Sequence, residues 1–241
     1  MLVIKRLLIA FMALFLVVLA VIVVRTLAHQ PRQALAVDQV LIPLDAEALA
    51  ERLSESIRFK TVSHQDPQHK DPSQFLGFID WVRQSYPLVD STLELTMLND
   101  TMLYRWEGSD ASLAPILITG HYDVVPVIPG SENKWNHPPY DGVIADGIVW
   151  GRGTLDDKSG VLGILEAVTY LIDRGHQPKR TVYLSFGHDE EIGGREGAAM
   201  VVAYLREQQV QLAWSLDEGS FVFDGLLPGV DGLVAAINVA E

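Results

Sequence analysis

The sequence predicts an α/β protein, with a mostly parallel sheet that has helices on both faces, preceded by an N-terminal transmembrane helix. Three observations lead to this prediction. Short apolar runs typical of strands alternate with segments of helical periodicity over residues 112–241. Potential metal ligands follow several of these runs, and a long uncharged stretch lies near the N-terminus.

Composition narrows the possible functions. The 241 residues suit one domain of medium size or slightly more, and the net charge of −13 results from 31 acidic and 18 basic side chains. A nucleic acid is therefore not expected as a partner, because binding its phosphates needs clustered Lys and Arg. The chain has no cysteine, so any bound metal must be held by nitrogen and oxygen ligands.

Residues 1–30 are predicted to be a membrane anchor or an uncleaved signal. The segment Leu7 to Val24 contains 18 consecutive uncharged residues, which as a helix reach about 27 Å, close to a hydrocarbon core of about 30 Å. Lys5 and Arg6 precede it, so we expect a single-pass anchor with the remainder of the chain on the extracytoplasmic side. Ala34-Leu35-Ala36 resembles a cleavage site, which leaves secretion after cleavage as the alternative, and residues 31–44 are predicted to be a tether.

The first part of the remaining chain predicts two helices and a hairpin. Asp45 is a candidate N-cap for a helix over 46–59, and Asp71-Pro72 is a typical start for a helix that stops before Pro87. Alternating residues predict strands at 92–98 and 101–106, joined by a turn at Asn99-Asp100.

The second part predicts alternating strands and helices. Strands are expected at 115–119, 148–150, 181–186, 212–216 and 233–239, and helices at 157–174 and 196–208.

Several predicted strands are followed by side chains that bind metals. These candidates are His121, Asp123, Asp156, Glu190, Glu191 and Asp217. Strands of one parallel sheet end along the same edge, so these side chains are expected to converge. One imidazole and several carboxylates would form a site for one or two divalent cations, and the chemistry most often performed by such sites is hydrolysis.

The local sequence suggests a role for each candidate near the first two strands. His121 and Asp123 lie two residues apart on an extended segment, so Asp123 is placed to orient the His121 ring. Asp156 could bridge two cations, although capping of the following helix is an alternative for it or for Asp157.

The acidic residues further along the chain are assigned different tasks. Glu191 is expected to bind a cation, while Glu190 remains free as a general base. Of the adjacent acids Asp217 and Glu218, Asp217 is the preferred ligand. His188 is expected to have a core or supporting role rather than to bind the metal.

Four stretches resemble the M20 family of zinc metallopeptidases and aminoacylases. They are GHYDVVPV at 120–127, WGRGTLDDK at 150–158, FGHDEEIGG at 186–194 and SLDEG at 215–219. In particular they resemble the subgroup of Gly-X carboxypeptidases and N-fatty-acyl-amino-acid hydrolases, over roughly residues 45–241. The resemblance implies a zinc-peptidase-like catalytic domain that cleaves small peptides or N-acyl amino acids with a free carboxylate.

The resemblance also implies specific roles. His121 and Asp217 would hold one Zn²⁺, Glu191 would hold the other, and Asp156 would bridge them, with Co²⁺ or Mn²⁺ as possible substitutes. Asp123 would support His121, and Glu190 would be the general base. The peptide bond between Asp156 and Asp157 would be cis.

The family's catalytic domain continues beyond the length of this chain. A lid domain that mediates dimerisation, and a late histidine that completes the second metal site, have no counterpart in the sequence. Residues 45–241 are therefore expected to be the N-terminal part of the catalytic domain and to be inactive alone. A non-catalytic, membrane-tethered remnant or binding module of the same fold is the main alternative, and a magnesium phosphohydrolase is a weaker one, because His121 suits zinc better.

Overall fold

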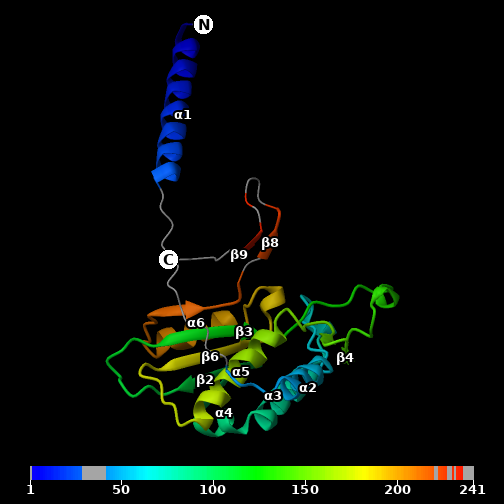
Figure 1. The fold of residues 1–241 in the computed structure, drawn as a ribbon. Coiled ribbons are helices and arrows are strands. Elements are labelled where there is room, and N and C mark those ends of the chain that lie inside the picture. Colours follow the sequence, from blue (N-terminus) through cyan, green and yellow to red (C-terminus); the bar gives the residue numbers. More distant parts are fainter. Residues whose placement is uncertain (1, 29–41, 220–221, 227–229, 231, 236–241) are drawn as a thin grey trace. The chain divides into compact units, whose positions relative to one another are not determined.

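The computed structural model describes residues 2–28, 42–219, 222–226, 230 and 232–235 (Figure 1). The chain divides into two compact units, Met1–Pro43 and Leu44–Glu241. Most of the predicted tether, residues 31–41, and the end of the last predicted strand, residues 236–239, lie outside the described residues.

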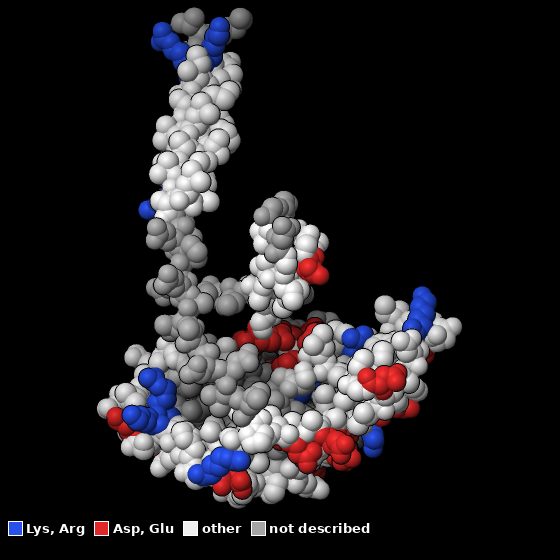
Figure 2. All heavy atoms as spheres, viewed as in Figure 1, with Lys and Arg blue, Asp and Glu red and all other residues white. Residues whose placement is uncertain are grey.

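The first unit contains the helix α1 (Leu2–Ala28), which includes the uncharged segment predicted to cross a membrane. Its segment Ile4–Ala28 has a mean hydropathy of 3.4 over its most apolar window, and none of that window is buried against protein. Figure 2 shows this surface without charge between basic side chains near the two ends of the helix. By length and composition, α1 could therefore be a membrane anchor or a signal sequence.

The second unit is built on a sheet that has five strands among the described residues, in the order β1-β2-β6-β3-β7. β1 and β2 pair antiparallel, as do β2 and β6, whereas β3 pairs parallel with both β6 and β7. Four strands therefore run in one direction and only β2 runs against them, which confirms the mainly parallel sheet. The bounds are β1 (Glu94–Leu98), β2 (Thr101–Trp106), β3 (Ile116–His121), β6 (Val182–Gly187) and β7 (Trp214–Leu216).

Helices cover both faces of this sheet, as predicted. Alternate strand residues such as Met102, Tyr104 and Leu184 pack in the larger core with the helices of one face. Strand residues whose side chains point to the other face of the sheet, such as Leu103, pack against α6 (Ala198–Glu207). The helices of the first face are α2 (Ala46–Ile57), α3 (Pro72–Ser85), α4 (Pro87–Thr92) and α5 (Lys158–Asp173).

The predicted caps and turns form for the expected reasons. Asp45 Oδ1 accepts the backbone N–H of Ala48 at the start of α2, and Asp71 Oδ1 accepts that of Ser73 at the start of α3. Asn99 has φ 52° in the turn between β1 and β2, a conformation that Asn tolerates better than most residues. Local side-chain chemistry therefore defines these element boundaries.

Smaller elements surround the sheet. The strands β4 (Val143–Ala145) and β5 (Ile148–Trp150) form one hairpin, and β8 (Val222–Asp224) and β9 (Leu233–Ala235) form another. Short 3-10 helices occur at η1 (Pro67–His69), η2 (Glu132–Lys134) and η3 (Glu190–Ile192). Of these, η3 matters most for the site, because only His188 and Asp189 separate it from the end of β6.

Candidate metal centre

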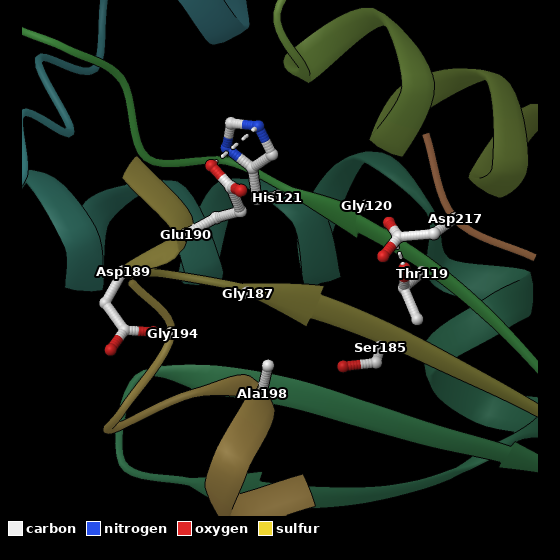
Figure 3. A pocket seen from close by; sticks show the side chains of 10 residues that line it. All are labelled: Thr119, Gly120, His121, Ser185, Gly187, Asp189, Glu190, Gly194, Ala198 and Asp217. Atoms are coloured by element: carbon white, nitrogen blue, oxygen red, sulfur yellow. Dashed lines mark hydrogen bonds and ion pairs between the residues drawn. The ribbon is translucent and has the colours of Figure 1, made fainter. Parts of the chain in front are cut away.

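The candidate site lies where the parallel strands β3 and β6 end. His121 is the last residue of β3 and pairs with Gly187, the last residue of β6, so the turn after β6 lies beside the imidazole. Figure 3 shows the side chains of His121 and Glu190 facing each other across this edge. The expected convergence of strand-end side chains therefore occurs for the segments of β3 and β6.

Three acidic side chains approach the Nε2 atom of His121. The nearest oxygen is Asp156 Oδ1 at 3.0 Å, followed by Glu218 Oε2 at 3.6 Å and Glu190 Oε2 at 3.8 Å. Ligand atoms of His121, Asp156 and Glu218 all lie within 4.8 Å of one another. Ligand atoms at these distances could all bind the same cation.

Asp123 connects the two strand ends. Its side chain is fully buried, and its two carboxylate oxygens accept the backbone N–H groups of Glu190 at 3.1 Å and Glu191 at 3.2 Å. Its backbone oxygen lies 3.0 Å from His121 Nδ1, and its Oδ1 lies 3.3 Å from the same nitrogen. Asp123 therefore contacts the imidazole and fixes the backbone that presents both glutamates, while its role in orienting His121 stays a prediction.

The start of α5 is packed tightly beneath His121. The peptide bond between Asp156 and Asp157 is cis, and Asp157 Oδ2 accepts the backbone N–H of His121 at 3.2 Å. A Cβ on Gly120 would lie 2.9 Å from Asp157 Oδ2, and one on Gly160 would lie 2.1 Å from Asp157 Oδ1. Both glycines are needed because any larger residue would collide with this buried carboxylate.

Lys158 is fully buried next to these acids. Its Nζ donates hydrogen bonds to the backbone oxygens of Ser56 at 2.8 Å and Phe59 at 2.7 Å, and lies over the ring of Phe78. The side chain therefore connects the start of α5 to the end of α2. Burial lowers the pKa of the Lys158 amine to about 7, although the charge of Asp123 opposes the shift.

Asp217 and Glu191 lie outside the three-residue group. Asp217 Oδ1 accepts a hydrogen bond from Thr119 Oγ1 at 2.5 Å, and Figure 3 shows Asp217 directed toward Thr119, away from His121. Glu191 is partly buried beside the group, close enough to sense the charges of Asp156 and His121. The preference for Asp217 over Glu218 as a ligand stays a prediction, and the geometry draws attention to Glu218.

The electrostatics of the site indicate excess negative charge. Burial raises the pKa of Glu191 and of Glu218, and the nearby charge of Asp156 raises both further. Burial lowers the pKa of His121, but the hydrogen bond and charge of Asp123, together with the charges of Glu190 and Glu218, outweigh it and raise this pKa to about 10. The acidic side chains around His121 therefore stabilise positive charge at this position.

Three residues near His121 have only a weak signal in the sequence. The adjacent Asp217 is the stronger sequence candidate beside Glu218, and Asp157 and Lys158 carry only the signal of a helix start. A signal for the latter pair is present in the sequence, because two charged residues stand at the start of an apolar helix. In the structure, Gly120 and Gly160 allow close approach to Asp157. His188 matches its expected supporting role, since it is buried and its Nδ1 lies 2.8 Å from Thr101 Oγ1.

Comparison with curated proteins shows extensive sequence similarity. A probable carboxypeptidase S-like protein of Dictyostelium discoideum is 39% identical over 80% of this chain and 38% of its own length. An N-fatty-acyl-amino acid synthase/hydrolase of Xenopus tropicalis is 37% identical over 98% of this chain and 47% of its own length. The chain therefore spans less than half the length of these relatives.

The fold and the family agree with the sequence comparison. The structure of human carnosine dipeptidase 1 superposes with a TM-score of 0.59 and 17% identity, over 74% of this chain and 39% of that one. Residues 117–234, which include His121, Asp156 and Glu190, match the sequence model of peptidase family M20/M25/M40. The chain therefore belongs to peptidase family M20/M25/M40.

Proposed function

We propose that this chain forms the metal-binding part of an amide hydrolase that acts on small peptides or N-acyl amino acids with a free carboxylate. The observation that carries the proposal is the group of His121, Asp156 and Glu218 at the strand ends, with Glu190 facing it. Family membership supports metal-dependent hydrolysis as the reaction class.

The donor set fits zinc better than magnesium. A buried imidazole nitrogen beside several carboxylates is typical of zinc ligands, whereas magnesium prefers oxygen ligands alone. Burial, and after it the charge of Asp156, raises the pKa of Glu191 and of Glu218, and one or two divalent cations would stabilise the ionised carboxylates. Bound zinc would polarise the scissile carbonyl and lower the pKa of a water molecule.

The proposed ligand set combines residues from four segments. His121 and Asp217 would hold one Zn²⁺, Glu191 the second, and Asp156 both; Co²⁺ or Mn²⁺ could substitute. The carboxylate of Asp156, 64% exposed, is accessible for bridging. Glu218 replaces Asp217 in this set if the arrangement around His121 persists when metal binds.

Glu190 is the proposed general base. Its carboxylate lies 3.8 Å from His121 Nε2 and is about half exposed, so it can reach both a water molecule and a substrate in the hollow beside the strand ends. It would remove the proton from the attacking water and deliver it to the leaving amine. Asp123 keeps Glu190 in place by accepting its backbone N–H.

The ligand choice between two adjacent acids is testable. We expect Asp217→Asn to weaken the binding of the first Zn²⁺ by about 10-fold or more, since a direct ligand is lost, and Glu218→Gln to weaken it less. Competition with a chromogenic zinc chelator measures both affinities. A larger effect of Glu218→Gln would assign the ligand to Glu218 instead.

The proposed reaction is tested on the full-length gene product. Metal-free protein is reconstituted with Zn²⁺ or Mg²⁺ and assayed on a panel of N-acyl amino acids, dipeptides and phosphate esters. We expect zinc-dependent amide cleavage that is lost on chelation. Zinc binding without cleavage of any amide would favour the non-catalytic binding module, and magnesium-dependent release of phosphate would favour a phosphohydrolase.

We also propose where in the cell the protein is located. α1 would anchor the protein in a membrane, with the metal centre on the extracytoplasmic side, or would direct secretion if it is cleaved. Protease protection in sealed vesicles, read with an antibody against residues of the second unit, distinguishes an anchored from a released protein and reports its side.

A further inference from the structure

We propose that a second pocket, outside the metal centre, binds a small carboxylate with an apolar or aromatic body. This pocket has a volume of about 460 Å³, within the range usual for small-molecule sites. Its lining includes two tryptophans, Trp135 and Trp150, and two cationic side chains, Lys134 and Arg152. We call it the Trp135–Arg152 pocket.

Two segments build the Trp135–Arg152 pocket. One is the loop between β3 and β4, which includes η2, and the other is the end of β5 with the residues after it. The backbone N–H of Arg152 donates to Pro139 O at 2.6 Å, and Trp150 Nε1 donates to Ala145 O at 3.3 Å. The two segments are thus joined at Arg152, which gives the pocket a fixed wall.

The charges of the pocket favour an anion. The guanidinium of Arg152 lies 5.4 Å from the centre of the Trp135 ring, and its Nε is buried without a hydrogen-bond partner among the described residues. Buried donors of this kind are normally satisfied, so the position of this nitrogen calls for an acceptor. Lys134 adds a second positive charge, and no acidic residue is among those that line the pocket.

Arg152 favours a carboxylate over other acceptors. A guanidinium presents parallel N–H groups that match the two oxygens of a carboxylate, and such charge-assisted bonds are the strongest hydrogen bonds of this type. The local positive charge is notable in a chain whose net charge is −13, because most of its surface would repel an anion.

The remaining lining favours an apolar body on the ligand. The rings of Trp135 and Trp150 are partly exposed, and Ile128 at the rim is 73% exposed. Indole rings bind flat or aliphatic groups over a large area at low entropic cost. The ligand is therefore amphipathic, with its carboxylate at Arg152 and Lys134 and its apolar part between the two indoles.

The Trp135–Arg152 pocket does not depend on the proposed hydrolysis. None of its lining residues belongs to the ligand set, although Arg152 precedes Asp156 by only four residues. Binding can therefore be measured on metal-free protein, where failure of this proposal and failure of the proposed reaction are separate results.

The experiment is calorimetric titration of the full chain in detergent with EDTA present. The probe is 3-phenylpropanoate, and its neutral isostere 3-phenylpropanamide is the matched ligand control. We expect the acid to bind at least about 10-fold more tightly than the amide, because the amide cannot form the charge-assisted bonds. Arg152→Met should weaken binding of the acid by about 10-fold or more and leave the amide unchanged.

Two further variants keep the test decisive. Arg174→Met removes another arginine that stacks on an aromatic ring, that of Tyr170, and should not change binding. Lys134→Gln alters an exposed side chain, so it should leave folding intact and weaken binding of the acid several-fold. The proposal would be overturned if the acid and the amide bound equally well, or if neither bound detectably. It would also be overturned if neither of the single variants Lys134→Gln and Arg152→Met weakened binding of the acid.

Discussion

Glu190→Gln should reduce kcat for amide cleavage by about 100-fold to 10,000-fold, the usual contribution of a positioned general base. The amide keeps the size of the side chain but cannot accept the proton of the attacking water. The backbone N–H of residue 190 still donates to Asp123, so the turn that holds η3 should be preserved. Steady-state kinetics on the substrate found in the panel above measures the effect.

The controls for this prediction separate chemistry from metal loss. Metal content by elemental analysis should be unchanged in Glu190→Gln, because Glu190 is not in the proposed ligand set. Glu207→Gln changes an exposed acid on the last turn of α6 and should retain full activity. Near-normal kcat in Glu190→Gln would remove Glu190 from the mechanism.

Lys158→Met should destabilise the folded protein by about 2–6 kcal/mol at pH 9. Methionine fills a similar volume, but the backbone oxygens of Ser56 and Phe59 lose their hydrogen-bond donor in a buried place, which costs about 1–3 kcal/mol for each group. A neutral amine retains two N–H donors, so the wild-type bonds do not require a charged lysine.

The cost of Lys158→Met should also depend on pH. The pKa of this amine is about 7 in the folded protein and 10.5 in the reference state, so between these values the unfolded chain binds the proton and the folded protein does not. Stability contributed by Lys158 is therefore lost as pH falls from 10.5 toward 7, by up to about 1.4 kcal/mol per pH unit, and changes little below 7. Lys158→Met should consequently be less harmful at pH 6 than at pH 9.

Urea unfolding of metal-free protein at pH 6 and pH 9 measures this difference. Lys179→Met, which removes a lysine whose side chain is exposed, is the matched control and should show a small effect without pH dependence. If the cost of Lys158→Met were equal at the two pH values, the buried amine would have to keep its charge throughout this range.

Local signals in the sequence were sufficient for much of the fold. The caps Asp45 and Asp71 and the turn at Asn99-Asp100 were predictable because each depends on a few neighbouring residues. The helix α4 is not expected from the sequence, where Pro87 indicates only the end of the preceding helix. Proline is also well suited to the first position of a helix, and here it starts a new one.

Features that depend on distant contacts could not be predicted in the same way. The sequence placed His121, Asp156 and Glu190 at strand ends, and the structure brings these three together. Which of Asp217 and Glu218 faces His121 depends on how a short strand pairs with β3, and adjacent residues give no local signal for that choice. The burial of Lys158 likewise depends on α2, about a hundred residues earlier in the chain.

The pair of hydrogen bonds that the Asp123 carboxylate accepts from the backbone of Glu190 and Glu191 has a consequence for how this protein can tolerate insertions. The two oxygens of one carboxylate match two successive amides, so a single residue inserted between Gly187 and Glu190 would shift both amides out of register. The loop from residue 125 to residue 142 has no such tie to Asp123 or His121 among the described hydrogen bonds. An insertion in that loop would therefore leave the Asp123 contacts intact, whereas one between Gly187 and Glu190 would break them.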